Sequence, residues 1–594
     1  MALADGGSDT IAYAVGSVLV WGAILVGIAI GWLPRARSTP YTAGAAICLV
    51  GIAVLTGLSA IWASDPGSAF DEAVLALGYA GLVTLILVAA GFGSARAWLA
   101  GLAVGLVAIA VLALGARLEP SVFGHGERDL ILDLPASEGR LSDPFLYWNA
   151  LGAAMAAGVI LLTWFASAAS TRPRRALAAA SLPLVILTLY LTGSRGGAAV
   201  AVLGLAVLIA AGTDRLRQVA ALAAGALGGA ALVVFTASRS DLVHHPLSET
   251  ARDQVTGVEL ALVGVVALVG LVAYFADTRI GRLHDPAVRL ERRHWLALGG
   301  VGAVALIAAV IAVDPAARWD EFKSPPDVPA AGEERELFAR GGSSGRYQFW
   351  STALDAFGED PVKGVGAAGY EYYWNANGSL PMPGPNGHSL VLDNAAELGL
   401  LGVAGVVGFA AFVLVGGVRR VREQAGDERG PAAAALAVVV AGLAQAAVDW
   451  MWENPAAFGV VLVCAGLVLG PATSHPDPPA PVTGERRSRR RFAGGVLLLA
   501  FSWVAICASA LLLLTNISLS SSRSAFGDGD LEAAADAAND AIDLQPWAAE
   551  PRQQLALVLE AQGDLAAARA EIAEAIENSP EDWRLWLVSA RMAL

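Results

Sequence analysis

The sequence predicts an all-α integral membrane protein. We expect a bundle of about 14 transmembrane helices with a large extracytoplasmic loop and a small C-terminal module of helical repeats. Of the 594 residues, 56% are hydrophobic and only 15% are charged, and the mean hydropathy is +0.58. A soluble chain of this length would carry more charge. The hydrophobic residues also fall in long runs separated by short charged loops, which is typical of a chain that crosses a bilayer many times.

Each crossing of about 30 Å of hydrocarbon requires roughly 20 apolar residues. Fourteen runs satisfy this requirement, and the sixth and seventh are short and joined by the turn GSRGG. The first run has no basic segment before it and no small-residue cleavage site after it, so we interpret it as a retained helix. The runs are centred near residues 22, 51, 80, 107, 155, 185, 204, 227, 266, 304, 403, 440, 462 and 504.

Arginine in the connecting loops predicts the orientation of the chain. Loops after the odd-numbered runs contain PRAR, SARA, TRPRRA, DRLR, RIGRL with RLERRH, RRVRE and ERRSRRR, whereas loops after even-numbered runs are acidic or mixed. Short cytoplasmic loops are enriched in Arg and Lys. Both termini and the long loop at about 314–388 are therefore expected on the extracytoplasmic side.

The chain divides into a predicted transmembrane domain, 1–515, and a predicted repeat module, 523–594. GDLEAAADAANDAIDLQP, which starts at Gly529, recurs as GDLAAARAEIAEAIENSP from Gly563. The offset of 34 residues is the tetratricopeptide period, with two antiparallel helices per repeat. Two roles stay open for the module: it docks a protein partner, or it caps and stabilises the membrane domain.

Neither a cofactor nor a metal is expected. The three cysteines, Cys48, Cys464 and Cys507, all fall within apolar runs, which argues against a disulfide framework or a thiolate site. His244 and His245 form a pair without further ligands at metal-binding spacing, and we interpret them as solvated loop residues. No nucleic-acid partner is expected.

Three residues on the outer side are candidates for chemistry. Arg195 lies in the turn TGSRGG, where glycines let backbone N–H groups approach an anion, and a guanidinium pairs well with pyrophosphate oxygens. Arg346, in GRYQFW, has the same character, and both arginines have the alternative of extending to lipid headgroups. His388, in PGPNGHSLVLDN, suits a general base; its alternative is a helix-start histidine capped by Asn386.

Further polar residues lie near these three. Arg140 and Asn149 flank the start of the fifth run, and Asn149 either binds a sugar or caps the helix. Asp449 and Glu453, in DWMWENP, offer carboxylates beside aromatic rings, which suit sugar contacts or form an aromatic belt with its caps. The large outer loop is expected to hold one or two short helices. One of them is a surface amphipathic helix on which Arg346, Trp350 and Leu354 recur at i, i+4 spacing.

Four motifs, in this order, resemble those of the O-antigen ligase and polymerase superfamily. They are RLSDPFLYWNALG, LTGSRGG, GRYQFWSTALDAFGEDPVKGVGAAGY and NGHSLVLDNAAELGLLG. Together with the helices between them, they cover about residues 140–460. The resemblance implies a metal-independent, inverting glycosyltransferase of the bacterial cytoplasmic membrane. Its donor would be an undecaprenyl-diphosphate-linked glycan and its acceptor a glycan or glycolipid. Membrane lipid would be a further partner.

The resemblance also implies roles for individual residues. Arg195 and Arg346 would bind the donor pyrophosphate, and His388 would activate the acceptor hydroxyl. The residues expected to contact donor or substrate are Arg140, Asn149, Tyr347, Glu397 and Asp449.

Two other functions compete with the transferase. A transporter or flippase of lipid-linked oligosaccharide would show internal repeats and ionisable groups near the bilayer midplane, whereas the predicted helix centres are Ala, Val, Leu and Gly. A membrane anchor that displays a docking module would explain the repeats but not the outer-loop motifs. The sequence therefore favours the enzyme.

Overall fold

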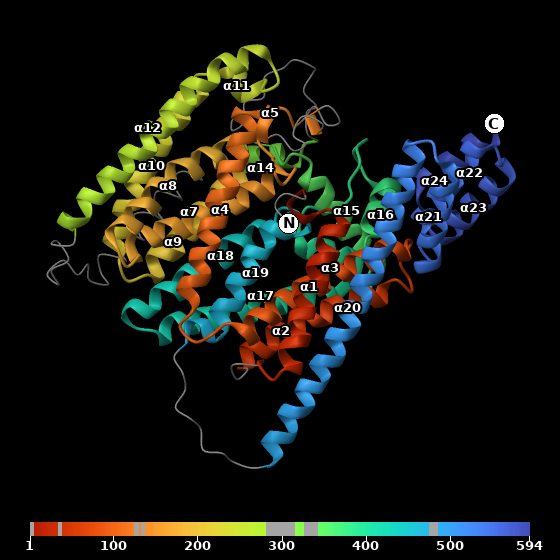
Figure 1. The fold of residues 1–594 in the computed structure, drawn as a ribbon, viewed down its shortest axis with the longest axis horizontal. Helices are drawn as coiled ribbons and strands as arrows, with labels where there is room; N and C mark the ends of the chain where they lie inside the picture. Colours follow the sequence, from red (N-terminus) through yellow and green to blue (C-terminus); the bar gives the residue numbers. More distant parts are fainter. Residues whose placement is uncertain are drawn as a thin grey trace.

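A computed structural model describes residues 5–33, 39–123, 130–131, 137–280, 315–325, 342–474 and 485–594. Throughout these ranges the regular secondary structure is helical and no strand occurs (Figure 1). The predicted all-α fold class is confirmed.

Thirteen of the fourteen predicted membrane spans coincide with described helices. Eleven of these helices are long and apolar enough to cross a bilayer, α9 and α19 are shorter, and the predicted span near residue 304 lies outside the described residues. The chain is a multi-pass membrane protein. The thirteen helices are α1 (Thr10–Ala29), α2 (Pro40–Ser59), α3 (Pro66–Ala89), α4 (Ala95–Leu118), α7 (Trp148–Ala168), α8 (Arg172–Leu191), α9 (Arg195–Ala211), α10 (Arg215–Ala237), α12 (Glu249–Ile280), α17 (Leu390–Glu423), α18 (Arg429–Ala446), α19 (Pro455–Leu469) and α20 (Glu485–Gly527).

Capping residues explain where several of these helices begin. Asp65 precedes α3, and its Oδ1 accepts hydrogen bonds from the backbone N–H groups of Gly67 at 2.9 Å and Ser68 at 3.2 Å. Pro66 follows at the first helical position, where its missing N–H costs nothing. Asn454 caps α19, which also starts with a proline.

Helices α7 and α18 form the centre of the bundle, since 94% and 78% of the residues in their apolar stretches are buried. Helix α9 packs against both through small residues. A Cβ on Gly197 would lie 2.9 Å from the carbonyl carbon of Gly152 in α7, so the two backbones touch, as in other membrane helix pairs with small residues at the interface. This packing fixes the start of α9, where Arg195 lies.

Helix α17 is broken about two and a half turns after its first residue. Gly399 has φ 62° and ψ −152°, which is not helical. The loop before α16 fills the break: Leu400 N–H donates to the Pro361 carbonyl at 2.8 Å, and Gly366 N–H donates to the Glu397 carbonyl at 2.9 Å. Broken helices in membrane proteins occur where backbone is buried in protein or lines a cavity. Here the first segment of α17 faces such a cavity, which is described below.

The long loop at about 314–388 was expected to hold one or two short helices, and it contains three described ones. They are α14 (Pro315–Lys323), α15 (Arg346–Glu359) and α16 (Tyr370–Asn377). The predicted helix at Arg346 therefore exists. Its buried face is formed by Phe349, Ala353 and Ala356, which pack on α16. Leu354, at the end of the predicted stripe, is 53% exposed, whereas Trp350 on the same stripe donates to the His388 carbonyl at 3.3 Å. Two shorter helices, α5 (Pro120–Phe123) and α11 (Ser240–His244), lie in other loops.

The tetratricopeptide module has the predicted form, with helices α21 (Leu531–Leu544), α22 (Ala549–Gln562), α23 (Leu565–Asn578) and α24 (Trp583–Ala593). Asp530 and Asp564, 34 positions apart, cap the first helix of each pair. The module extends from the end of α20 and lies beside α16 (Figure 1).

The module also contacts the membrane domain directly. Arg584 pairs with Glu371 of α16, Ser64 donates to Glu581 at 2.8 Å, and the rings of Phe70 and Trp547 meet edge to face at 5.9 Å. These contacts support the capping role, while docking of a protein partner stays a prediction.

Arg584→Glu should loosen this contact. The substitution places two carboxylates together where an ion pair stood, and a partly exposed pair of this kind contributes up to about 1 kcal/mol. We expect limited proteolysis within residues 579–583 to become about fivefold faster. Arg591→Glu is the matched control, because the partner of Arg591, Glu560, lies inside the module. Equal acceleration in both variants would contradict the capping role.

Candidate active site

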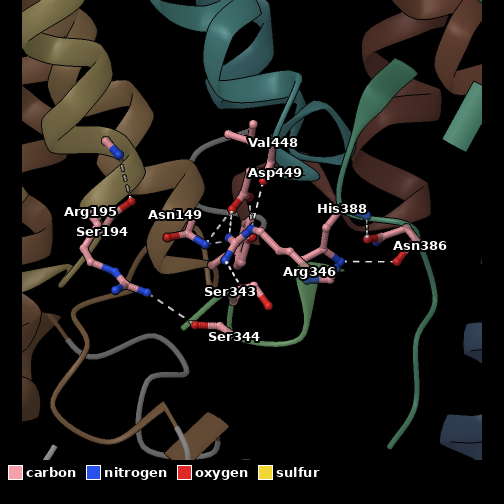
Figure 2. A network of polar contacts seen from close by, with 12 residues as sticks. Asn149, Ser194, Arg195, Ser343, Ser344, Arg346, Asn386, His388, Val448 and Asp449 are labelled. Atoms are coloured by element: carbon pink, nitrogen blue, oxygen red, sulfur yellow. Dashed lines mark hydrogen bonds and ion pairs between the residues drawn. The ribbon is translucent and has the colours of Figure 1, made fainter. Parts of the chain in front are cut away.

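Asp449 is the centre of a buried polar network between α7, α15 and the segment after α18. It is 1% exposed. Its Oδ2 accepts from Asn149 Nδ2 at 2.8 Å and from Arg346 Nη2 at 2.5 Å, and its Oδ1 accepts from the hydroxyl of Tyr147 (Figure 2). Asn149 also donates to the Tyr147 hydroxyl at 3.1 Å. Three of the residues predicted from sequence, Asn149, Arg346 and Asp449, are thus in direct contact.

Arg346 is the first residue of α15, directly after a tight turn. The turn contains Ser344 (φ 57°) and Gly345 (φ 87°), both in the left-handed region. Besides its ion pair with Asp449, the guanidinium donates through Nε to the Val448 carbonyl at 2.9 Å. With a side chain that is 22% exposed, Arg346 is held rigidly and still reaches the surface.

Arg195 lies on the other side of the same turn. It is the first residue of α9, and Ser194 caps that helix by accepting from Gly197 N–H at 3.1 Å. Its Nη2 lies 3.4 Å from the Gly342 carbonyl and 3.4 Å from the Ser344 hydroxyl (Figure 2). Two guanidinium groups from distant helices therefore flank one short turn, with the N-terminal end of α9 beside them. Such a surface favours an anion.

His388 lies in a left-handed conformation with φ 54°. Its ring stacks on Phe349, with centroids 4.7 Å apart and planes 6° apart, and Nδ1 lies 3.2 Å from the Asn386 carbonyl. Burial, assisted by the positive charge of Arg346, lowers the pKa of His388 to about 4. The imidazole is therefore neutral at physiological pH.

The contact at Nδ1 decides which ring nitrogen carries the proton. A carbonyl oxygen only accepts, so Nδ1 carries the hydrogen and donates it to Asn386. The lone pair of the neutral ring is then on Nε2. This is the tautomer that a general base requires, with one nitrogen oriented by the backbone and the other able to take a proton.

Burial raises the pKa of Asp449, against the opposing effects of Arg346 and Tyr147. Burial and the neighbouring Asp449 charge also raise the pKa of Tyr147. The tyrosine thus stays a hydrogen-bond donor, and its donated bond and those of Asn149 and Arg346 compensate the carboxylate. A buried carboxylate needs such compensation.

The other predicted residues occupy different surroundings. The guanidinium of Arg140 lies over the ring of Trp148 at 4.9 Å. Tyr347 packs edge-on against Trp319 and Phe322 of α14, at 6.2 Å and 6.3 Å, on an aromatic surface rather than in the Asp449 network. Glu397 lines the cavity beside α17.

Two residues of the network were absent from the predicted site. Tyr147 donates to Asp449, and its ring stacks on Trp450 with centroids 4.0 Å apart. Tyr147 lies near the predicted residue Asn149 in YWN, and Trp450 lies next to the predicted residue Asp449 in DWMWEN. An aromatic residue close to each polar candidate was therefore the signal that could have identified them. The pair His244 and His245 does not join this site; His245 Nδ1 lies 3.1 Å from Glu138.

Comparison with known families agrees with two of the four motifs, GRYQFWSTALDAFGEDPVKGVGAAGY and NGHSLVLDNAAELGLLG, which lie within the matched residues. Residues 255–407 match the family model described as O-Antigen ligase, and residues 549–592 match the model described as Tetratricopeptide repeat. The first match contains Arg346, Tyr347, His388 and Glu397. Among curated proteins, none matches the chain.

Proposed function

We propose, from the O-antigen ligase domain that the chain carries at residues 255–407, that this protein is a glycosyltransferase of the bacterial cytoplasmic membrane. It moves a glycan from undecaprenyl diphosphate to an acceptor hydroxyl on the extracytoplasmic face, where both termini also lie. The observation that carries the proposal is that Arg195 and Arg346 lie on the two sides of one turn. His388 lies close enough to Arg346 for the guanidinium charge to help lower the pKa of His388.

In this proposal the two guanidinium groups hold the donor diphosphate. Their planar forks match phosphate oxygens, and the start of α9 adds backbone N–H groups. As the carrier leaves, negative charge grows on the diphosphate, and fixed cations there stabilise the transition state. The arginines supply charge stabilisation that a divalent metal supplies in other transferases, so we propose a metal-independent reaction.

His388 completes the reaction from the acceptor side. Its Nε2 lone pair takes the proton of the acceptor hydroxyl while the oxygen attacks the anomeric carbon of the donor. The bond from that carbon to the diphosphate oxygen breaks, and undecaprenyl diphosphate leaves with the electron pair. Attack opposite the leaving group inverts the anomeric configuration. Asp449, Tyr147 and Asn149 act by holding Arg346 in place.

The alternative of a transporter or flippase is not favoured, because a flippase needs no base opposite the diphosphate site. The test is purified protein in nanodiscs with undecaprenyl-diphosphate glycan and an acceptor glycolipid, together with complementation of a ligase-null or polymerase-null host. We expect release of undecaprenyl diphosphate and a surface glycan ladder from wild type at matched expression. We expect neither from His388→Ala or Arg346→Ala, and release lowered about 10²–10³-fold in Arg195→Ala. Equal activity of all four proteins would refute the assigned site, and carrier movement without bond cleavage would refute the transferase.

The lowered pKa of His388 predicts the pH dependence of transfer. A base with a pKa of about 4 stays neutral far below the ordinary value of about 6.5. We expect kcat/KM to be flat from pH 8 to about 5 and to fall about tenfold per pH unit below about 4. The shift also makes folding less stable as pH falls from about 6.5 to about 4, because the unfolded chain takes up the proton first. A midpoint near 6.5 in wild type, or an unchanged acid limb in the residual activity of His388→Asn, would contradict this prediction.

A further inference from the structure

A cavity of about 410 Å³ lies at the end of the bundle where α3 and α17 begin. Its volume falls in the range of small-ligand sites. Six carboxylic acids line it, and no Arg, Lys or His is among its described lining residues. The six are Asp71, Glu72, Glu371, Asp393, Glu397 and Glu453. Glu371 pairs with Arg584, but the other five have no basic partner among the described residues. Acidic groups that share a space in this way repel one another when ionised, so a ligand with positive charge is the one that suits this cavity.

Asp393 provides a second, independent sign of a ligand. The residue is 5% exposed, its Oδ1 accepts from Gly387 N–H at 2.5 Å, and its Oδ2 is buried without a hydrogen-bond partner. Buried polar atoms in proteins are almost always paired, and leaving a charged one unpaired is costly. The hydrogen-bonding capacity of Oδ2 is therefore unused within the described residues, beside a cavity large enough for a bound group.

The remaining walls fit a sugar. Trp450, Trp452 and Tyr79 line the cavity with aromatic rings, and Asn386 and Asn394 line it with amides. Carboxylates and amides accept hydrogen bonds from sugar hydroxyls. Aromatic rings present an apolar surface to a sugar ring and attract a nearby cation.

The cavity is adjacent to the residues proposed for transfer. Asn386 lies in its wall, accepts from His388 N–H at 3.3 Å and donates to Glu453 at 3.3 Å. The ring of Trp450, another wall residue, lies 6.2 Å from the ring of His388. A ligand in the cavity is thus on the His388 side of the site.

We propose that this cavity is a subsite for the acceptor glycan and that it binds a sugar bearing a protonated amino group. The word acceptor rests on the proposed function, whereas the binding of an amino sugar does not. A metal ion is a poorer occupant, since among the described residues no group of three His, Cys, Asp or Glu side chains has a geometry that could hold one. The cavity disfavours sugars that carry phosphate or carboxylate, because five of its six acids have no basic partner among the described residues to offset a further negative charge.

The test is tryptophan fluorescence of the full chain in nanodiscs at about pH 6, where amino groups of this kind are protonated. The probes are chitotriose with free amino groups (three amino sugars, cationic), maltotriose (neutral) and trigalacturonate (anionic). We expect saturable quenching by chitotriose, weaker binding of maltotriose and none of trigalacturonate. Asp393→Asn keeps the shape and the contact to Gly387, and should bind chitotriose about tenfold less tightly, as expected for one lost charge-assisted hydrogen bond.

Three further proteins complete the experiment. Glu397→Gln should also weaken chitotriose binding, and Asp355→Asn, an exposed acid on α15, should leave it unchanged. Arg195→Ala should lower transfer about 10²–10³-fold but still bind chitotriose, so failure of the donor site and failure of this subsite are distinguishable. Equal binding of the three trisaccharides, or unchanged affinity in both Asp393→Asn and Glu397→Gln, would overturn the proposal. Chitotriose binding that depends on Asp393 in a protein without transferase activity would uphold the subsite and refute the acceptor role.

Discussion

Asp449→Ala is expected to destabilise the protein by about 3–5 kcal/mol and to abolish transfer. The carboxylate compensates the buried end of Arg346 and accepts from Tyr147 and Asn149. Removing one member of a buried ion pair leaves the other charge uncompensated, which costs about this much. The measurement is unfolding of the purified protein in mild detergent, alongside undecaprenyl diphosphate release.

A double-mutant cycle separates this network from a general packing defect. Arg346→Ala removes the other charge, so the double variant Asp449→Ala/Arg346→Ala should lose less stability than the sum of the two single losses. Asp449→Asn keeps the shape and one acceptor oxygen, and should be more stable than Asp449→Ala. Additive losses would mean that the two side chains are not energetically coupled.

Arg195→Ala is expected to lower kcat/KM for transfer by about 10²–10³-fold, the usual cost of removing one preorganised donor from a developing anion, while the fold is retained. Arg195 is exposed at the first position of α9, and α9 is held by its contacts to α7 and α18, so its truncation removes charge rather than core packing. Arg195→Lys keeps the charge but loses the planar fork, and should fall between wild type and Arg195→Ala. The measurement is single-turnover release of undecaprenyl diphosphate.

The matched control for Arg195→Ala is Arg252→Ala, an exposed arginine near the start of α12. It should transfer at the wild-type rate. If Arg252→Ala loses as much activity as Arg195→Ala, surface charge in general, and not a diphosphate site, accounts for the effect.

Local patterns were sufficient to predict most helices of this protein. Apolar runs of about 20 residues predict membrane spans because every crossing must satisfy its own backbone hydrogen bonds. The repeat module was equally accessible, since its two units share a 34-residue period and equivalent caps at Asp530 and Asp564. Asn149, Arg346 and Asp449 were also among the predicted site residues, and the structure brings them into contact.

What the sequence could not provide is the pairing of residues far apart along the chain. Tyr147 and Asp449 are 302 positions apart, and nothing in either segment indicates the other. Tyr347, one position from Arg346, packs against α14 and not in the Asp449 network, because neighbouring positions on a helix face different directions; its contact with substrate stays a prediction. The acidic cavity was hidden for the same reason, because its carboxylates come from α3, α16, α17 and the segment before α19.

The uninterrupted helix α20 has a mechanical consequence. Its 43 residues correspond to about 65 Å at 1.5 Å per residue, roughly twice the hydrocarbon thickness. One rigid rod therefore continues from the lipid into the repeat module without a hinge, and α1 packs along it. A partner that binds the repeats and shifts them would therefore also shift α20 and the helix packed along it. We expect the tilt of α1 in the membrane to change when such a partner binds.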